Sequence, residues 1–135
     1  MAFYFRNVFL LIVLVLFLSI TCEAGILPHK RSINSTNDVG AELAMHCKSK
    51  NDDLGAHAIP DKGSYAFTFR PNILGTTQFW CSFAWGSEFH YFDIYIHKRD
   101  DWLCNYCLWI IKPTGPCMWN YDTNAWDICS KWNES

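Results

Sequence analysis

Two aromatic runs between Thr77 and Asp101 constrain the fold more than any other feature of this sequence. In the first run, apolar residues recur at every second position, which is the periodicity of a β-strand. These residues are Phe79, Cys81, Phe83 and Trp85. The second run places Phe92, Ile94 and Ile96 on one face and Tyr91, Asp93, Tyr95 and His97 on the other. Gly86 and Ser87 lie between the runs and favour a turn, so the sequence predicts a central β-hairpin.

The N-terminal residues 1–24 are organised like a secretory signal peptide. Arg6 supplies a positive charge, an apolar run extends from Phe9 to Ile20, and Ala24 ends a segment typical of a cleavage site. A membrane anchor is the alternative, but about 12 apolar residues fall short of the roughly 20 that a spanning helix needs. We therefore expect a secreted, extracellular protein whose single mature domain comprises residues 25–135.

The charge balance argues against two classes of partner. The formal net charge is −2 at pH 7, and the sequence contains no basic stripe or basic tail. It therefore gives no electrostatic reason to expect binding to nucleic acid or an anionic membrane. We expect a monomer that binds no nucleic acid, does not insert into a membrane and needs no cofactor.

The cysteines predict disulfides, because an even number remains after signal-peptide cleavage in a chain bound for an oxidising compartment. These are Cys47, Cys81, Cys104, Cys107, Cys117 and Cys129. Six cysteines allow about 15 pairings, and their positions alone do not choose among them.

The rest of the chain predicts about seven short strands separated by Gly, Pro and Asn turns, and no long amphipathic helix. Residues 26–37 suggest an edge strand or an arm, and residues 42–48 alternate as a half-buried strand. Residues 49–60 show little periodicity and predict a long surface loop. The tail around Trp126, Cys129 and Trp132 fits either a helical turn or an irregular segment. The fold class is all-β, a small antiparallel sandwich or barrel.

No motif predicts an active site. Cys104-Asn105-Tyr106-Cys107 has the spacing of a redox pair, but it lacks the βαβ context of one, and no second close pair completes a zinc site. Structural disulfides explain it better. Paired histidines with a lysine could act on a phosphodiester, as in secreted plant ribonucleases, but neither His46 nor His90 lies in their His-Gly-Leu-Trp-Pro type of motif. We expect no catalytic or metal-binding residues. Trp80 and Trp102 are the tryptophans to test for exposure.

Several segments together resemble the plant self-incompatibility S1 family, the S-protein homologues. They are Met45 to Gly55, Phe69-Arg70-Pro71-Asn72, Thr76 to Phe83, Phe92-Asp93-Ile94-Tyr95, Arg99-Asp100, Cys107 with Trp109, Gly115-Pro116-Cys117 and Trp126 to Cys129. The resemblance extends from about Ile33 to Trp132 and implies a small secreted sandwich of two antiparallel sheets, pinned by disulfides. It implies two pairs among Cys47, Cys81, Cys107 and Cys117, and we infer a third between Cys104 and Cys129.

The same resemblance implies a non-enzymatic recognition or signalling ligand that a cell-surface receptor of unknown identity binds. The founding members are pistil ligands recognised at the pollen surface. A secreted defence protein that binds microbial glycans or acts as a weak hydrolase is the alternative.

Two surface loops are the candidates for recognition, because loops tolerate substitution better than strands. One is the segment 49–60, and the other is the charged corner Lys98, Arg99, Asp100 and Asp101. The alternative for Arg99 and Asp100 is a structural pair that shapes the turn. Asn34 and Asn133 begin N-glycosylation sequons, of which the second is the poorer candidate.

Overall fold

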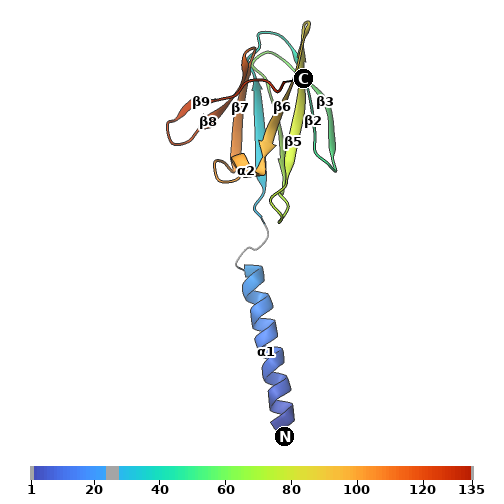
Figure 1. Ribbon diagram of the computed structural model, residues 1–135, viewed down its shortest axis with the longest axis vertical. Helices are drawn as coiled ribbons and strands as arrows, with labels where there is room; N and C mark the ends of the chain where they lie inside the picture. Colours follow the sequence, from blue (N-terminus) through green and yellow to red (C-terminus); the bar gives the residue numbers. More distant parts are fainter. Residues whose placement is uncertain (1, 24–27, 135) are drawn as a thin grey trace.

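The computed structural model describes residues 2–23 and 28–134. Two β-sheets form a sandwich, and an N-terminal helix lies below it in Figure 1. The elements are α1 (Ala2–Glu23), β1 (Arg31–Asn37), β2 (Leu43–Lys48), β3 (Asp53–Ile59), β4 (Ser64–Phe69), β5 (Gln78–Trp85), β6 (Glu88–Ile96), α2 (His97–Asp100), β7 (Tyr106–Lys112), β8 (Gly115–Asn120) and β9 (Ala125–Cys129). The expected cleavage site after Ala24 lies outside the described residues.

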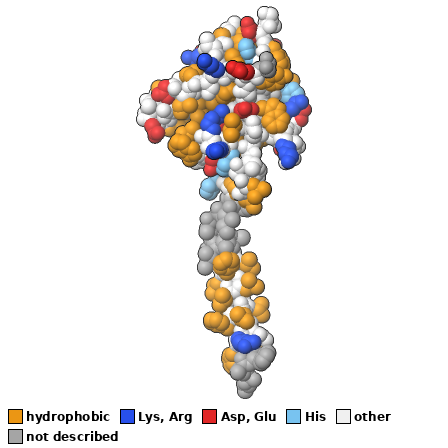
Figure 2. Space-filling model, viewed as in Figure 1, with side chains coloured by type: hydrophobic (Ala, Val, Ile, Leu, Met, Phe, Trp, Pro, Cys, Tyr) orange, Lys and Arg blue, Asp and Glu red, His pale blue; other side chains and the backbone are white. Residues whose placement is uncertain are grey.

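The α1 helix corresponds to the apolar part of the expected signal peptide, and apolar side chains cover its surface (Figure 2). Among the residues that the structure describes, no helix has the length and apolarity required to cross a bilayer.

The two sheets have the strand orders β4-β1-β7-β8-β9 and β3-β2-β5-β6. Their inner faces are apolar because buried and accessible residues alternate along the strands, as in the Leu43, Met45 and Cys47 series of β2. Trp109, Phe83, Ile33 and Ile111 are among the largest buried side chains between the sheets. The predicted all-β sandwich is confirmed.

Two predictions about its strands are wrong. The first strand is not at an edge, because β1 lies between β4 and β7, and it pairs with β7 in parallel, so the sandwich is not purely antiparallel. The polar sequence of β1 does not predict a central strand, since Ser35 and Asn37 face inward where apolar residues are expected. The long loop 49–60 is in fact a short turn followed by β3, an edge strand with only one buried residue, Ile59.

The first half of the tail is neither of the two predicted structures, a helical turn or an irregular segment. Residues 125–129 form β9, the edge strand of the five-stranded sheet, and an irregular segment follows them. In that segment the Trp132 indole stacks on His90 at 4.8 Å between ring centroids and donates to the Pro113 carbonyl at 3.0 Å. The tail therefore ties the two sheets together at one side of the sandwich.

The predicted β5–β6 hairpin is confirmed, with Gly86 at its turn in the left-handed region at φ 54°. One side-chain assignment is wrong, because Tyr95 is completely buried. The register runs from Phe79 opposite Tyr95 to Cys81 opposite Phe92, so β6 has one extra residue there. Such a bulge interrupts strict alternation, and it turns both Ile94 and Tyr95 inward.

All six cysteines of the sandwich are paired, but two of the three expected pairings are wrong. The pairs are Cys47–Cys81, Cys104–Cys107 and Cys117–Cys129. Cys107 lies in the core, whereas Cys117 is opposite Ile110 and next to the inward-facing Met118, so it is on the other face of its sheet, where it is also buried. Cys117 instead lies opposite Cys129 in the register, with 4.0 Å between their Cα atoms. Adjacent strands thus set the pairing of Cys129, which leaves Cys104 to Cys107.

Burial of Tyr95 predicts a loss of stability at alkaline pH. Burial raises the pKa of the Tyr95 hydroxyl to about 12, from 10.0 for an exposed tyrosine. A group with a raised folded-state pKa stabilises fully below its unfolded pKa, so this contribution is lost as the pH rises from about 10 to about 12. We expect Tyr95→Phe to lose stability less steeply than wild type over that range in urea titrations. Equal slopes would contradict the assignment.

Candidate recognition surface

Arg99 and Asp100 form an ion pair that fixes the corner between β6 and β7, with Asp100 buried and Arg99 half-buried. The Arg99 Nε and Nη2 atoms donate to the Asp100 carboxylate at 2.6 and 2.7 Å, and Nη2 also donates to the Asp93 carbonyl at 2.8 Å. The Arg99 guanidinium lies over the Trp109 ring at 5.6 Å from its centroid. Asp100 also accepts from the Ile96 backbone N–H at 2.9 Å. The structural alternative therefore describes this pair, and the prediction that Asp100 faces a partner is wrong, because it is 1% exposed.

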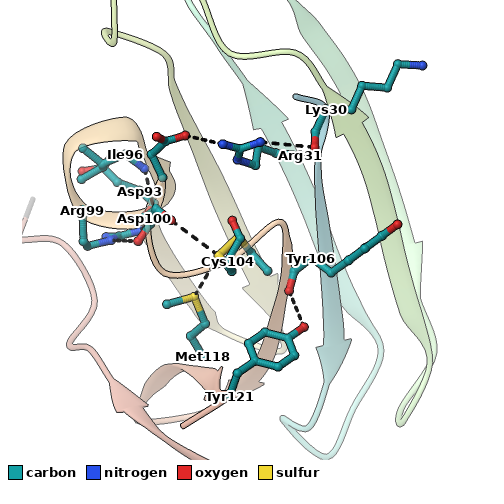
Figure 3. The surroundings of a disulfide bond; sticks show 12 residues. Lys30, Arg31, Asp93, Ile96, Arg99, Asp100, Cys104, Tyr106, Met118 and Tyr121 are labelled. Atoms are coloured by element: carbon teal, nitrogen blue, oxygen red, sulfur yellow. Dashed lines mark hydrogen bonds and ion pairs between the residues drawn. A yellow bond between two sulfur atoms is a disulfide. The ribbon is translucent and has the colours of Figure 1, made fainter. Parts of the chain in front are cut away.

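The other two charged residues of the corner differ from each other. Asp101 binds the Nη2 atom of the buried Arg31 at 2.6 Å, which links the corner to β1. Figure 3 labels Arg31 beside the Arg99 and Asp100 corner. Lys98 is exposed and forms no ion pair among the described residues. Of the four predicted contact residues, Lys98 alone is fully available to a partner.

Loops from both sheets meet at the end of the sandwich that contains this corner. Lys48 lies opposite Trp80, and Gln78 lies opposite Ile96, so the β2–β3 turn, the β4–β5 loop and α2 are all at one end. We call this the loop end. It has a hollow of about 490 Å³ between the β2–β3 turn and the β4–β5 loop. The lining residues are Ser49, Lys50, Asn51, Asp52, Thr68, Phe69, Arg70, Asn72, Thr76, Thr77, Gln78, Phe79 and Trp80.

The β4–β5 loop owes its shape to its own side chains. The Asn72 backbone N–H donates to the Thr77 hydroxyl at 2.8 Å, and the Thr76 backbone N–H donates to the Asn72 side-chain oxygen at 3.0 Å. Gly75 has φ 72°, and an added Cβ would lie 3.2 Å from the His97 ring, so the loop packs closely on α2. The wall of the hollow is therefore held in place without a partner.

Two apolar side chains at the tip of this loop are exposed, and the sequence did not lead us to predict them as functional residues. Ile73 is 72% exposed and Leu74 is 81% exposed. The available signal was an apolar pair between Pro71-Asn72 and Gly75, where a turn normally has polar residues. Trp80 is half-buried in the hollow, and Trp102 is exposed beside α2.

The histidines of the described sandwich that follow lie in separate local contacts. His46 Nε2 lies 2.5 Å from Asp53 Oδ1, and this hydrogen bond lowers the pKa of the Asp53 carboxyl below its usual value. Neither residue lines the hollow, whose only acidic side chain is Asp52. His57 stacks on Tyr65, and His90 contacts Glu88. Among the described residues, no group of three or more His, Cys, Asp or Glu could hold a metal.

The two sequon asparagines lie in different settings. Asn34 is in β1, opposite Ala66 and Leu108, and its side chain is half-buried on the outer face of the five-stranded sheet. Asn133 is exposed, and its backbone N–H donates to the Tyr91 carbonyl at 2.8 Å. Glycosylation of either residue stays a prediction.

Fold and surface together define a small disulfide-bonded β-sandwich with a loop-lined hollow. The family model for plant self-incompatibility protein S1 matches residues 32–132. S-protein homolog 5 of Arabidopsis thaliana is 51% identical over 86 residues, which cover 63% of this chain and 67% of that protein. S-protein homolog 2 of the same plant is 42% identical over 113 residues, covering 78% and 70%. This chain belongs to the plant self-incompatibility S1 family.

A solved structure shares the fold. It is described as that of self-incompatibility protein homologue proteins, a widespread family of small, highly stable, secreted proteins from plants. The TM-score is 0.56 at 19% sequence identity, with 79% of this chain and 97% of that chain covered.

Proposed function

We propose that the protein is a secreted, non-enzymatic recognition ligand of the S1 type, which a cell-surface receptor binds through the loop end. One observation carries this proposal. The hollow of about 490 Å³ is made by loop and strand-end residues whose shape is fixed by internal hydrogen bonds. A preformed concave surface binds with a smaller loss of conformational freedom than a flexible one.

The lining of the hollow suits protein recognition better than catalysis. Lys50 and Arg70 supply positive charge, Phe69 and Trp80 supply apolar surface, and Gln78 supplies an amide. Charged groups at such a rim govern the association rate and the choice of partner. No histidine is among the lining residues, and the titratable side chains there are Lys50, Asp52 and Arg70.

Secretion agrees with two further features. The three disulfides fit an oxidising compartment, and the apolar α1 helix fits a signal peptide. The described secretion of the structural relative supports the same assignment.

The test is saturable binding of labelled mature protein to intact plant cells from the tissue that expresses it and from neighbouring tissues. We expect Lys50→Ala combined with Asn51→Ala to weaken binding at least tenfold, because both exposed residues line the hollow. Ser87→Ala combined with Lys131→Ala changes two exposed residues at the opposite end and serves as the control. Equal affinities of the two double variants would refute the placement of the receptor site.

The alternative is a defence protein that binds microbial glycans or acts as a weak hydrolase. One observation favours it, namely that Trp102 is 79% exposed and available to stack on a sugar ring. It forms no ring contact with another aromatic among the described residues, so it offers a single stacking surface. A glycan array run beside ribonuclease and glycosidase assays separates the two functions.

A further inference from the structure

We propose that the loop end docks on an anionic lipid bilayer, with Ile73 and Leu74 inserted among the lipids and basic side chains on the phosphates. This surface adjoins the receptor hollow and shares Arg70 with it, and we call it the lipid-facing tip. It comprises Ile73, Leu74, Trp102, Lys30, Arg70 and Lys98.

The apex of the tip is aliphatic and rigid. The β4–β5 loop projects beyond the ends of the strands (Figure 1). Leu74 is the most exposed large apolar residue of the sandwich at 81%, and Ile73 next to it is 72% exposed. The bonds of Asn72 to Thr76 and Thr77 prevent the loop from folding back over these side chains. The cost of exposing them to water is therefore constant until something outside the chain covers them.

Aromatic side chains are concentrated at the same end. Tyr106 begins β7 opposite Ser32, and the Tyr121 hydroxyl donates to the Tyr106 carbonyl at 2.7 Å, as Figure 3 shows. With Trp102 beside α2, three of the exposed aromatics of the sandwich lie here, and the other two, Phe89 and Tyr91, lie along β6. Tryptophan and tyrosine favour the headgroup level of a bilayer, where one side of the ring meets hydrocarbon and the polar atom meets water.

Basic side chains surround the apex without carboxylate partners among the described residues. Arg70 directly precedes the loop, and its Nη1 atom donates to the Pro28 carbonyl at 2.7 Å, which places Lys30 nearby. Lys98 follows His97, the residue that packs against Gly75. Lys30, Arg70 and Lys98 are all exposed.

Three carboxylates of the loop end are paired with bases within the fold. Asp100 pairs with Arg99, Asp101 with Arg31, and Asp53 with His46 and Lys48. Asp52 and Asp122 are exposed without an ion pair among the described residues, Asp93 accepts from the Gln78 amide at 3.0 Å, and Asp127 accepts from the Thr123 hydroxyl at 2.7 Å. The net charge of −2 does not describe the apex itself, where Lys30, Arg70 and Lys98 form no ion pair among the described residues.

The layering distinguishes a bilayer from a protein partner. A convex aliphatic apex, aromatic rings behind it and unpaired bases around it match the order of hydrocarbon, headgroup and phosphate in a membrane. Each basic side chain near an anionic leaflet strengthens binding, and salt weakens this attraction by screening it. The following test distinguishes a bilayer from a protein as the partner of the tip.

The test is sedimentation of the refolded mature protein, residues 25–135, with vesicles that contain no receptor. We expect binding to phosphatidylcholine vesicles containing about 30% phosphatidylserine, weak binding to pure phosphatidylcholine, and a decrease as salt rises. Ile73→Ser with Leu74→Ser, and separately Lys30→Glu with Lys98→Glu, should each weaken binding at least tenfold. Phe89→Ser and Lys131→Glu are the matched controls, since they remove an exposed apolar group and a base away from the tip. These controls should bind as wild type.

Three results would overturn the proposal. They are wild-type protein that stays in the supernatant, tip variants that bind as wild type, and controls that lose as much binding as the tip variants. If the Ile73 and Leu74 variant loses binding to cells while wild type does not bind vesicles, the tip contacts a protein. The receptor proposal stands or falls separately, because its Lys50 and Asn51 variant is scored on cells.

Discussion

Replacing both Cys47 and Cys81 with alanine is expected to lower the free energy of unfolding by about 4 kcal/mol. This disulfide closes a chain segment of 34 residues, whereas the other two close segments of 12 and 3 residues. The loop-entropy relation gives about 3 kcal/mol for Cys117–Cys129 and about 1.5 kcal/mol for Cys104–Cys107. Because Cys47 and Cys81 are both fully buried between β2 and β5, cavities left by alanine add to the loss.

The measurement is urea unfolding of the three double-alanine variants beside wild type, followed by tryptophan fluorescence. The expected order of destabilisation is Cys47–Cys81, then Cys117–Cys129, then Cys104–Cys107. If the Cys104–Cys107 variant proved the least stable, the CxxC disulfide would be holding the corner near α2 in a way that chain entropy does not describe.

Asp100→Asn is expected to cost about 3 to 5 kcal/mol, the second large effect. Asparagine has the same shape, so the change removes the charge and one acceptor while it leaves packing intact. Arg99 would then keep a guanidinium between the Phe92 and Trp109 rings with no counterion. The amide would also present an N–H group to the Arg99 or Ile96 donors that now bind the carboxylate. The half-buried Arg99 charge, left without its carboxylate, accounts for most of the expected loss.

Thermal and urea unfolding measure this change, with Asp52→Asn as the matched control. Asp52 is an exposed aspartate of the same end without an ion pair among the described residues, and its change should stay within about 0.5 kcal/mol of wild type. A loss below about 1 kcal/mol for Asp100→Asn would show that the pair is replaceable, and would return the corner to the candidates for partner contact.

Strict alternation made the β5–β6 hairpin and β2 predictable, since a strand that buries one face leaves that pattern in its residues. The bulge at Asp93 and Ile94 was not predictable in this way, because one inserted residue shifts every later side chain without a local sequence signal. β1 was misplaced for a related reason. Its inward Ser35 and Asn37 resemble surface residues, although the Asn37 amide donates to the Ala41 and Ile59 carbonyls at 2.7 and 3.0 Å.

The candidate site was less predictable than the fold. Sequence placed recognition in the charged corner, but opposite charges close together are equally typical of a buried structural pair, and only burial distinguishes the two cases. The β2–β3 turn lay within a predicted loop, yet the hollow also needs the β4–β5 loop, which is distant in sequence and adjacent across the register of β2 and β5.

The sequence alone determined that this chain forms strands with one apolar face each, cross-linked by disulfides. Alternation along a strand and the number of cysteines can both be read directly from the sequence. The tertiary structure alone decided which cysteines pair, which charges are buried and which loops share an end. Those outcomes depend on strand register and strand order, since residues distant along the chain become neighbours only when the sheets form. The Thr77 to Asp101 segment shows both, with strands that alternation predicts and a charged corner whose role only burial reveals.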